Sequence, residues 1–399
     1  MTHEHHDTCL CDNLPVEPAT HEQHEAIDDA RRGLPLSRRS IMVGLGAVAA
    51  STSIPLASAQ AAGRDHQRPT QSGRMKLVLL GTRAGPPAVK GQRGTASALV
   101  VNGKTYVIDA GRAAVTQFEE AGLRFDTIAG VFLTHLHADH IADYYNFFLL
   151  GGHIPNPDGD RITRPVPIYG PGQAGGLPPK FGGGTAPTIA PEAPTPGTLL
   201  LTENLHRAYA YSSNVFLRDM NIPDIRQLMD VREITTPAGA TFENTCPDMA
   251  PVEIFDDGNV KVSAVLVPHG PMFPSYAYRF DTEYGSVTFS GDTTYSKNLI
   301  GMAHRTDILV HECVDLTGAT LNPADRDHML QSHVELQKMG AIAEAAEAKK
   351  LVVSHYVKFT PGPINFGTFR RDAQIGYTRG RAVIGRELDV FEIGGRRRS

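Results

Sequence analysis

The chain has 399 residues, of which 41% are hydrophobic, so it can bury a sizeable core and is not a disordered protein. Residues 1–59 carry four basic and eight acidic side chains, and the remainder carries 34 basic and 35 acidic ones. A nearly neutral body gives no electrostatic reason to expect a nucleic-acid partner, because such proteins depend on an excess of Lys and Arg.

Residues 1–59 read as a targeting segment. The stretch 37–42 (SRRSIM) resembles the twin-arginine export signal, with Ile41 in place of the usual Phe. A Gly- and Ala-rich apolar stretch over 43–56 is too short to span a membrane. It is followed by small residues at 57–59 that suit a signal peptidase. We expect export by the twin-arginine machinery to the periplasm or the exterior, without stable membrane insertion. The alternative is a disordered N-terminus with a chance arginine pair.

A polar linker over 60–74 precedes a domain that we expect over 75–393, and a basic tail follows at 394–399. Short apolar runs predict strands, and a hairpin turn is expected at Asn102-Gly103. In the first half these strands are 76–80, 98–101, 105–108 and 128–133, with a helix over 113–122. In the second half they are 260–267, 276–280, 286–289, 308–310 and 351–355, with a helix over 333–348. This alternation indicates a layered α/β domain.

The segment 171–230 is expected to form an arm or lid. Residues 171–198 are dominated by Gly and Pro and do not suit regular structure, whereas residues 199–230 look helical. Over 151–250 there are seven Lys or Arg against ten Asp or Glu, which argues against a long RNA substrate. The arm also offers a surface for a second copy, so a homodimer stays open.

Four candidate metal ligands follow the strand expected over 128–133, in the segment 134–140 (THLHADH). A turn that leaves a strand can present them as a group, and imidazole nitrogens with carboxylate oxygens suit zinc or a similar ion. Two such ions can share a bridging hydroxide, which is a strong nucleophile at neutral pH. The alternative is a histidine-rich surface turn. The four candidate ligands are His135, His137, Asp139 and His140.

This His-x-His-x-Asp-His pattern resembles the signature of the metallo-β-lactamase superfamily, over about residues 75–393. The motifs at 80–82 (LGT), 109–111 (DAG) and 290–293 (SGDT) are similar to the ribonuclease Z and arylsulfatase branch. The resemblance implies a four-layer αββα sandwich and two divalent metal ions, zinc by preference. It implies a first metal on His135, His137 and His269, and a second on Asp139, His140 and His355. It also implies Asp292 as a bridge between the metals and Asp109 as a support of the metal loop.

Two catalytic roles are expected. Asp139 can orient the nucleophile as well as bind metal. His333 matches a histidine that touches the anionic group of the substrate in the ribonuclease Z branch, and it can protonate a leaving group. A helix-cap setting is the alternative for His333. The segment 311–313 (HEC) resembles a His-Glu-Ala-Thr element but departs from it, so the role of Glu312 stays open. Four further histidines are expected at the surface or at caps: His153, His206, His304 and His328.

The expected function is that of an exported hydrolase of a small-molecule sulfate ester or phosphodiester. Aromatic residues of the arm, such as Tyr209 and Phe216, favour a small and partly apolar substrate, although core packing explains any single one as well. The same metals would serve a lactone, carboxylic ester or β-lactam hydrolase with a different pocket. A non-catalytic metal-binding protein is a third reading.

Overall fold

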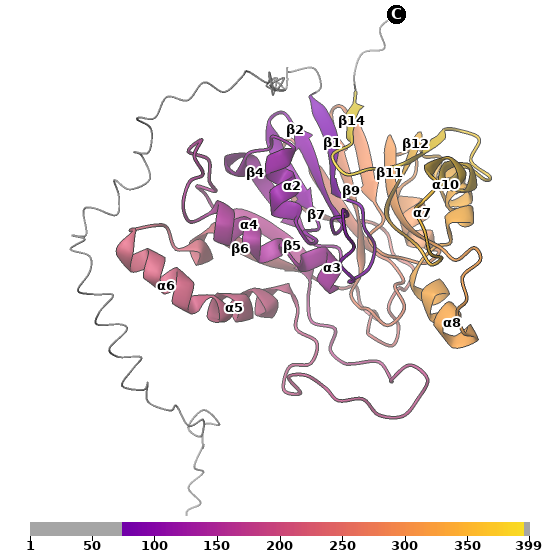
Figure 1. Ribbon diagram of the computed structural model, residues 1–399, viewed down its shortest axis with the longest axis horizontal. Helices are drawn as coiled ribbons and strands as arrows, with labels where there is room; N and C mark the ends of the chain where they lie inside the picture. Colours follow the sequence, from indigo (N-terminus) through magenta and orange to yellow (C-terminus); the bar gives the residue numbers. More distant parts are fainter. Residues whose placement is uncertain (1–73, 395–399) are drawn as a thin grey trace, which may run out of the picture. The chain divides into compact units, whose positions relative to one another are not determined.

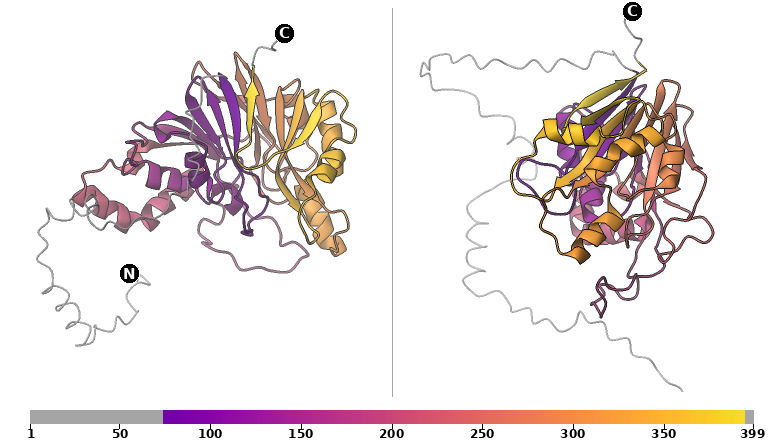
Figure 2. Two further views of the ribbon diagram at one scale, coloured as in Figure 1. Left: turned by 45° about the horizontal axis from the view of Figure 1, so that its top comes forward. Right: turned by 90° about the vertical axis from the view of Figure 1, so that its right-hand side faces the viewer.

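The computed structural model describes residues 74–394. Residues 1–73 and 395–399 lie outside the described residues, and with them the expected leader, nearly all of the linker and the tail. The described residues form two facing seven-stranded sheets with helices on both outer faces (Figures 1 and 2). The expected four-layer αββα sandwich is therefore confirmed.

The first sheet has the strand order β14-β1-β2-β3-β4-β5-β6, and the second has the order β13-β12-β11-β10-β9-β8-β7. Each sheet is mixed, with antiparallel pairs on one side and parallel pairs on the other. The strands of the first sheet are β1 (Met75–Gly81), β2 (Ala96–Val101), β3 (Lys104–Ile108), β4 (Ile128–Phe132), β5 (Val166–Pro171), β6 (Met229–Ile234) and β14 (Val390–Ile393). Those of the second are β7 (Val252–Asp256), β8 (Lys261–Leu266), β9 (Tyr276–Thr282), β10 (Gly285–Phe289), β11 (Ile308–Asp315), β12 (Lys350–Lys358) and β13 (Arg381–Ile384).

Helices cover the outer face of each sheet. The first sheet carries α2 (Ala114–Glu120), α3 (Ala138–Ile141), α4 (Tyr144–Gly151), α5 (Thr198–Ala208) and the 3₁₀ turns Phe125–Thr127 and Ile225–Leu228. α6 (Ala210–Asp219) continues from α5 and has no buried residue. The second carries α7 (Lys297–Met302), α8 (Pro323–Ser332), the 3₁₀ turn Leu336–Lys338, α9 (Met339–Ala345) and α10 (Phe366–Ala373). None of the helices within residues 74–394 is both long and apolar enough to cross a membrane.

The burial of the strands explains the layers. In β1, Met75, Leu77 and Leu79 point into the core between the sheets, whereas Val78 and Leu80 point toward the helices. Successive side chains of a strand alternate between its two faces, so a continuous apolar run is buried on both sides. The same alternation in β8 and β12 builds the third apolar cluster, beneath α7, α9 and α10.

The end of the arm differs from the expectation. Residues 172–197 contain no helix or strand, and α5 and α6 follow, but α6 ends at Asp219 and only the 3₁₀ turn Ile225–Leu228 comes after it. Met229 begins β6, which pairs in parallel with β5, so residues 229–230 belong to the sheet. A short edge strand whose central residues are half exposed carries little apolar periodicity, which is why the pattern read as helical.

Candidate metal centre

The histidine-rich turn leaves the end of β4 and is fixed by Asp109. The carboxylate Oδ1 of Asp109 accepts hydrogen bonds from the backbone N–H of Thr134 at 2.8 Å and from its hydroxyl at 3.0 Å. Asp109 has a φ of 56°, in the left-handed region that Asp and Asn tolerate better than most residues. Its backbone conformation and its side chain together set the position from which the turn starts.

The first cluster contains His135, His137, His269 and Asp292, whose ligand atoms all lie within 4.8 Å of one another. Nδ1 of His137 lies 3.0 Å from Nε2 of His135 and 3.1 Å from Nε2 of His269. His135, His269 and Asp292 are almost completely buried. Residues that are up to 157 positions apart in the sequence are thus gathered around one point.

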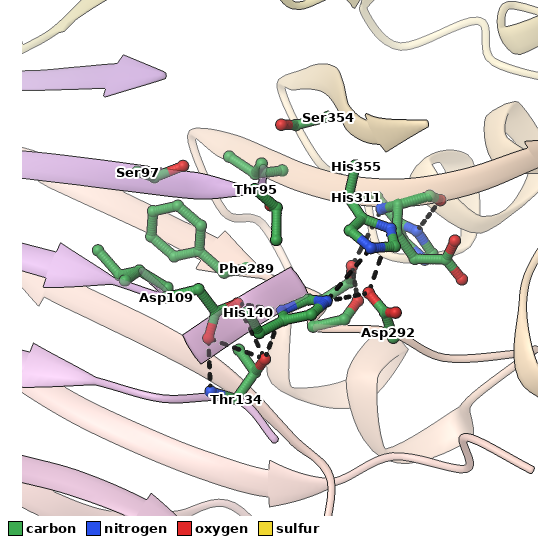
Figure 3. A pocket seen from close by; sticks show the side chains of 15 residues that line it. Thr95, Ser97, Asp109, Thr134, His140, Phe289, Asp292, His311, Ser354 and His355 are labelled. Carbon is green, nitrogen blue, oxygen red and sulfur yellow. Dashed lines mark hydrogen bonds and ion pairs between the residues drawn. The ribbon is translucent and has the colours of Figure 1, made fainter. Parts of the chain in front are cut away.

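The second cluster contains Asp139, His140 and His355, again with ligand atoms within 4.8 Å. Nε2 of His355 lies 3.2 Å from Nε2 of His140 and 3.2 Å from Oδ2 of Asp139. Asp292 lies between the clusters, with Oδ1 3.3 Å from His140 and 3.2 Å from His355 (Figure 3). The structure therefore brings together all seven residues that the sequence predicts as ligands.

A bulge in β12 accounts for the position of His355. The pairing of β11 with β12 shifts between His311 and Cys313, so that Val353 and Tyr356 face these two residues. Two residues of β12, Ser354 and His355, thus stand opposite one residue of β11, and His355 has a φ of 50°. Bulges re-aim side chains next to functional sites, and this one brings His355 to the second cluster.

Outer hydrogen bonds decide which ring nitrogen faces inward. Nδ1 of His140 lies 2.8 Å from Oδ2 of Asp109, and Nδ1 of His269 lies 2.8 Å from the carbonyl oxygen of Ser332. Each Nδ1 donates its proton to an oxygen, which leaves the lone pair of Nε2 directed into the site. The carboxylate of Asp109 thus supports the metal loop, as the sequence predicts.

The charge states of the site fit a metal centre. Burial lowers the pKa of His135 well below its ordinary value and that of His269 to about 3, so both imidazoles are neutral. Burial opposes the ionisation of Asp292, but His355 and His140 hold its pKa well below the usual range. Oδ1 of Asp292 and Nδ1 of His355 are buried without a hydrogen bond, although they lie 3.2 Å apart. The neutral imidazoles of His135 and His269, the ionised Asp292 and the unsatisfied ligand atoms are compatible with a dinuclear metal site.

His333 stands at the edge of the centre and is held by Glu312. Its ring centroid lies 5.0 Å from that of His269, and its Nδ1 lies 3.2 Å from Oε2 of Glu312. Oε1 of Glu312 accepts hydrogen bonds from the backbone N–H groups of Val334 and Thr293. Burial opposes protonation of His333, but Glu312 raises its pKa to about 9. Glu312, whose role the sequence leaves open, thus joins the ring of His333 to the backbone of Val334 and Thr293.

A cavity of about 490 Å³ opens onto both clusters. Its wall contains His137, Asp139, His269, Asp292, His333 and His355, together with Arg83, His328, Lys358 and Phe359. The sequence did not indicate these last four as site residues. A signal for Arg83 exists, because it directly follows the 80–82 (LGT) motif at the end of β1.

Two of the histidines expected at the surface or at caps lie elsewhere. His328 lines the cavity. His153 is 4% exposed and packs against the ring of Phe216 from α6, because it follows α4 at the point where the arm covers that helix.

The chain is similar to known proteins in sequence and in structure. The sequence model of the family described as "Anti-Pycsar protein Apyc1" matches residues 75–146. The chain is 27% identical over 286 residues to ribonuclease Z of Mycolicibacterium gilvum (strain PYR-GCK), covering 71% of this chain and 84% of the relative. It is 25% identical over 325 residues to ribonuclease Z of Mycobacterium bovis (strain BCG / Pasteur 1173P2), covering 81% and 100%.

Two solved structures superpose over most of the chain. Human tRNase Z, short form, has a TM-score of 0.52 at 20% identity, covering 80% of this chain and 99% of that one. The metallo-β-lactamase fold protein YhfI from Bacillus subtilis has a TM-score of 0.51 at 18% identity, covering 80% and 99%. The chain has the metallo-β-lactamase fold. With its ribonuclease Z relatives and its two ligand clusters, it is a metal-dependent hydrolase of that fold.

Proposed function

We propose that this metallo-β-lactamase-fold hydrolase cleaves a phosphodiester or sulfate ester of a small anionic molecule. The observation that carries the proposal is the pair of cations on the cavity wall. Within residues 74–394, the side chain of Arg83 makes no hydrogen bond or ion pair, and its Nε is buried. In the same part of the chain, Nζ of Lys358 donates only to the carbonyl oxygen of Pro361, at 3.3 Å. Arg83 is half-buried near the carboxylate of Asp139, and its buried Nε has no hydrogen-bond partner. Leaving a buried donor unsatisfied is costly, so an anionic substrate group would supply the partner that this Nε lacks.

The seven clustered residues would hold two divalent ions, for which the nitrogen and oxygen donors favour zinc. Such ions supply a nucleophile at neutral pH and a Lewis acid. Asp139, whose Oδ2 accepts a hydrogen bond from Gly85 N–H at 2.8 Å, would orient the nucleophile as well as bind metal. The guanidinium of Arg83 would bind a non-bridging oxygen of the ester, because its planar fork suits phosphate and sulfate oxygens. His333 would donate its proton to the leaving oxygen, with Glu312 keeping the ring in place.

The relatives favour a phosphodiester over a sulfate ester, because those that match along most of the chain are named ribonuclease Z. The substrate itself we propose to be small rather than RNA. The described part of the arm carries no excess of basic side chains, since residues 151–250 hold seven Lys or Arg against ten Asp or Glu. We also propose that the enzyme is exported through the leader. Outside the cytoplasm it would meet small extracellular esters.

Matched chromogenic esters test the proposal. The zinc-loaded full chain would be incubated with nitrophenyl sulfate, bis-nitrophenyl phosphate and a transfer RNA precursor with a 3′ extension, with an Asp139→Ala variant as the control for contaminants. We expect turnover of bis-nitrophenyl phosphate that the variant lacks. Zinc binding without turnover of either nitrophenyl ester would overturn the anionic-ester proposal. Efficient cleavage of the RNA with weak turnover of the esters would overturn the proposal that the substrate is small.

A further inference from the structure

We infer that an apolar pocket beside the metal centre binds an apolar group of the substrate, so that the ester is amphipathic. This inference rests on the proposed function and specifies its substrate. The pocket has a volume of about 260 Å³ and lies between the loop 172–197, the start of α5 and the turn after β8. Its wall includes Leu136, Ile141, Leu177, Leu201, Met272 and Phe273. The residues that line it include no charged side chain, so it suits an aryl or alkyl group rather than a second anion.

Two chain segments connect this pocket directly to the metal centre. Leu136 lies in the pocket wall, and in the sequence it stands between His135 and His137 of the first cluster. In the second segment, Met272 lines the pocket, and its N–H donates to the carbonyl oxygen of His269 at 3.0 Å. Pro271 lines both the pocket and the metal cavity. When the ester group of a substrate lies at the metals, its apolar part can therefore reach the pocket.

The loop 172–197 forms the outer wall of the pocket. It is a long excursion without helix or strand between β5 and α5 (Figure 1). A Cβ at Gly176 would collide with the ring of Phe242, so a larger residue there would require that ring to move. Further along, Phe181 contacts His328 of α8, with ring centroids 4.9 Å apart, and His328 lines the metal cavity. The same loop thus bounds the apolar pocket and reaches the opposite wall of the cavity.

The test compares three phosphodiesters with the same nitrophenolate leaving group, whose second group is methyl, phenyl or octyl. Because the leaving group is constant, differences report binding of the second group. We expect the wild-type chain to prefer phenyl or octyl over methyl by roughly tenfold or more in kcat/KM, in line with the discrimination that apolar pockets achieve. Leu177→Asp, which places a charge at a half-exposed position of the pocket wall, should bring this ratio close to one.

Matched variants separate this effect from general damage. Ile189→Asp adds the same charge to the same loop at a position that is 91% exposed and does not line the pocket, and it should keep the wild-type ratio. Thr195→Trp fills the pocket from a second position and should act like Leu177→Asp. Equal wild-type rates on all three esters, or an equal loss on all three in Leu177→Asp, would overturn the apolar subsite while the proposed function stands. A change of oligomeric state in Leu177→Asp with an unchanged ratio would also overturn it, and would assign the pocket to a second copy. Turnover of none of the esters would refute the proposed function itself.

Discussion

Oδ2 of Asp109 lies 2.8 Å from Nδ1 of His140, and this contact determines that Nε2 of His140 faces the second cluster. The pair joins the end of β3 to the histidine turn after β4, which are neighbouring parallel strands. Because the carboxylate both orients the imidazole and increases its basicity, we expect the metal affinity of the second cluster to depend on a residue that is not itself one of the ligands.

Asp109→Asn should weaken metal binding by about 10- to 100-fold, since losses of this size follow the removal of such outer partners. Asn tolerates the left-handed backbone conformation of residue 109, so the turn itself should persist. Competition with a chromogenic chelator measures the affinity. Asp158→Asn is the control, because Asp158 lies exposed in a loop and makes no side-chain hydrogen bond or ion pair within the described chain. An unchanged affinity in Asp109→Asn would show that the contact does not tune the metal.

Removal of the metals should abolish hydrolysis and lower the Tm. A ligand at 1,000 times its Kd stabilises the folded state by about 4 kcal/mol, and a metal would also give a partner to the buried, unsatisfied Oδ1 of Asp292 and Nδ1 of His355. Thermal unfolding with zinc and with excess chelator measures the difference. A double variant, His135→Ala with Asp292→Ala, should show a much smaller response to the chelator. A full response in that variant would place the bound metal outside the first cluster, for example on the histidines of residues 1–24.

His333→Gln should reduce the rate of hydrolysis more for esters with poor leaving groups than for esters with good ones. An alkoxide needs a proton as it departs, whereas nitrophenolate does not, so we expect a loss of about 10²- to 10⁴-fold on an alkyl phosphodiester and a much smaller loss on a nitrophenyl one. Steady-state kinetics across a series of leaving groups measures this. His328→Gln alters another histidine of the same cavity and should reduce all rates alike or not at all. Equal losses across the series in His333→Gln would contradict proton donation by His333.

Arg83→Met should reduce kcat/KM on anionic esters by roughly 10- to 100-fold, which corresponds to a charge-assisted hydrogen bond of about 1.5–3 kcal/mol. The kcat/KM on a neutral ester such as nitrophenyl acetate should fall little, because this ester offers no anionic oxygen. Arg83→Lys should recover the charge but not the bidentate geometry, so its kcat/KM on anionic esters should lie between those of the wild type and of Arg83→Met. Arg218→Met, on the exposed face of α6, is the control. A similar loss on the neutral ester would mean that Arg83 acts on the fold rather than on the anion.

Gly81→Ala should destabilise the domain by about 1–3 kcal/mol. A Cβ at Gly81 would collide with the carbonyl oxygen of Gly94, a backbone atom that has no room to move aside. Chemical denaturation at constant zinc measures the free energy of unfolding. Gly301→Ala is the matched control, since a Cβ there meets nothing within 4 Å and Ala favours helix α7 by about 0.5–1 kcal/mol. Equal stabilities of the two variants would mean that the contact at Gly81 is not tight.

Local sequence predicts those parts of the protein whose physics is local. The alternation of Met75 to Leu80 already specifies a strand that is buried on both faces, and Asn102-Gly103 specifies its neighbouring hairpin. The segment 134–140 identifies a metal turn because imidazoles and a carboxylate rarely gather so densely for another purpose. Weakly patterned elements, such as the edge strand β6, were not predicted, because their pairing rather than their own residues makes them strands.

The sequence by itself determined the layered fold, the chemistry of the metal ligands and, through resemblance, which distant histidines join them. Tertiary structure alone decided that Glu312 reaches His333, that Arg83 lines the cavity with its Nε unsatisfied within residues 74–394, and that an apolar pocket adjoins the cavity. These relationships depend on strand order, on the bulge at His355 and on the course of the loop 172–197. None of them has a sequence period or a motif, because each arises where segments far apart in the chain come into contact.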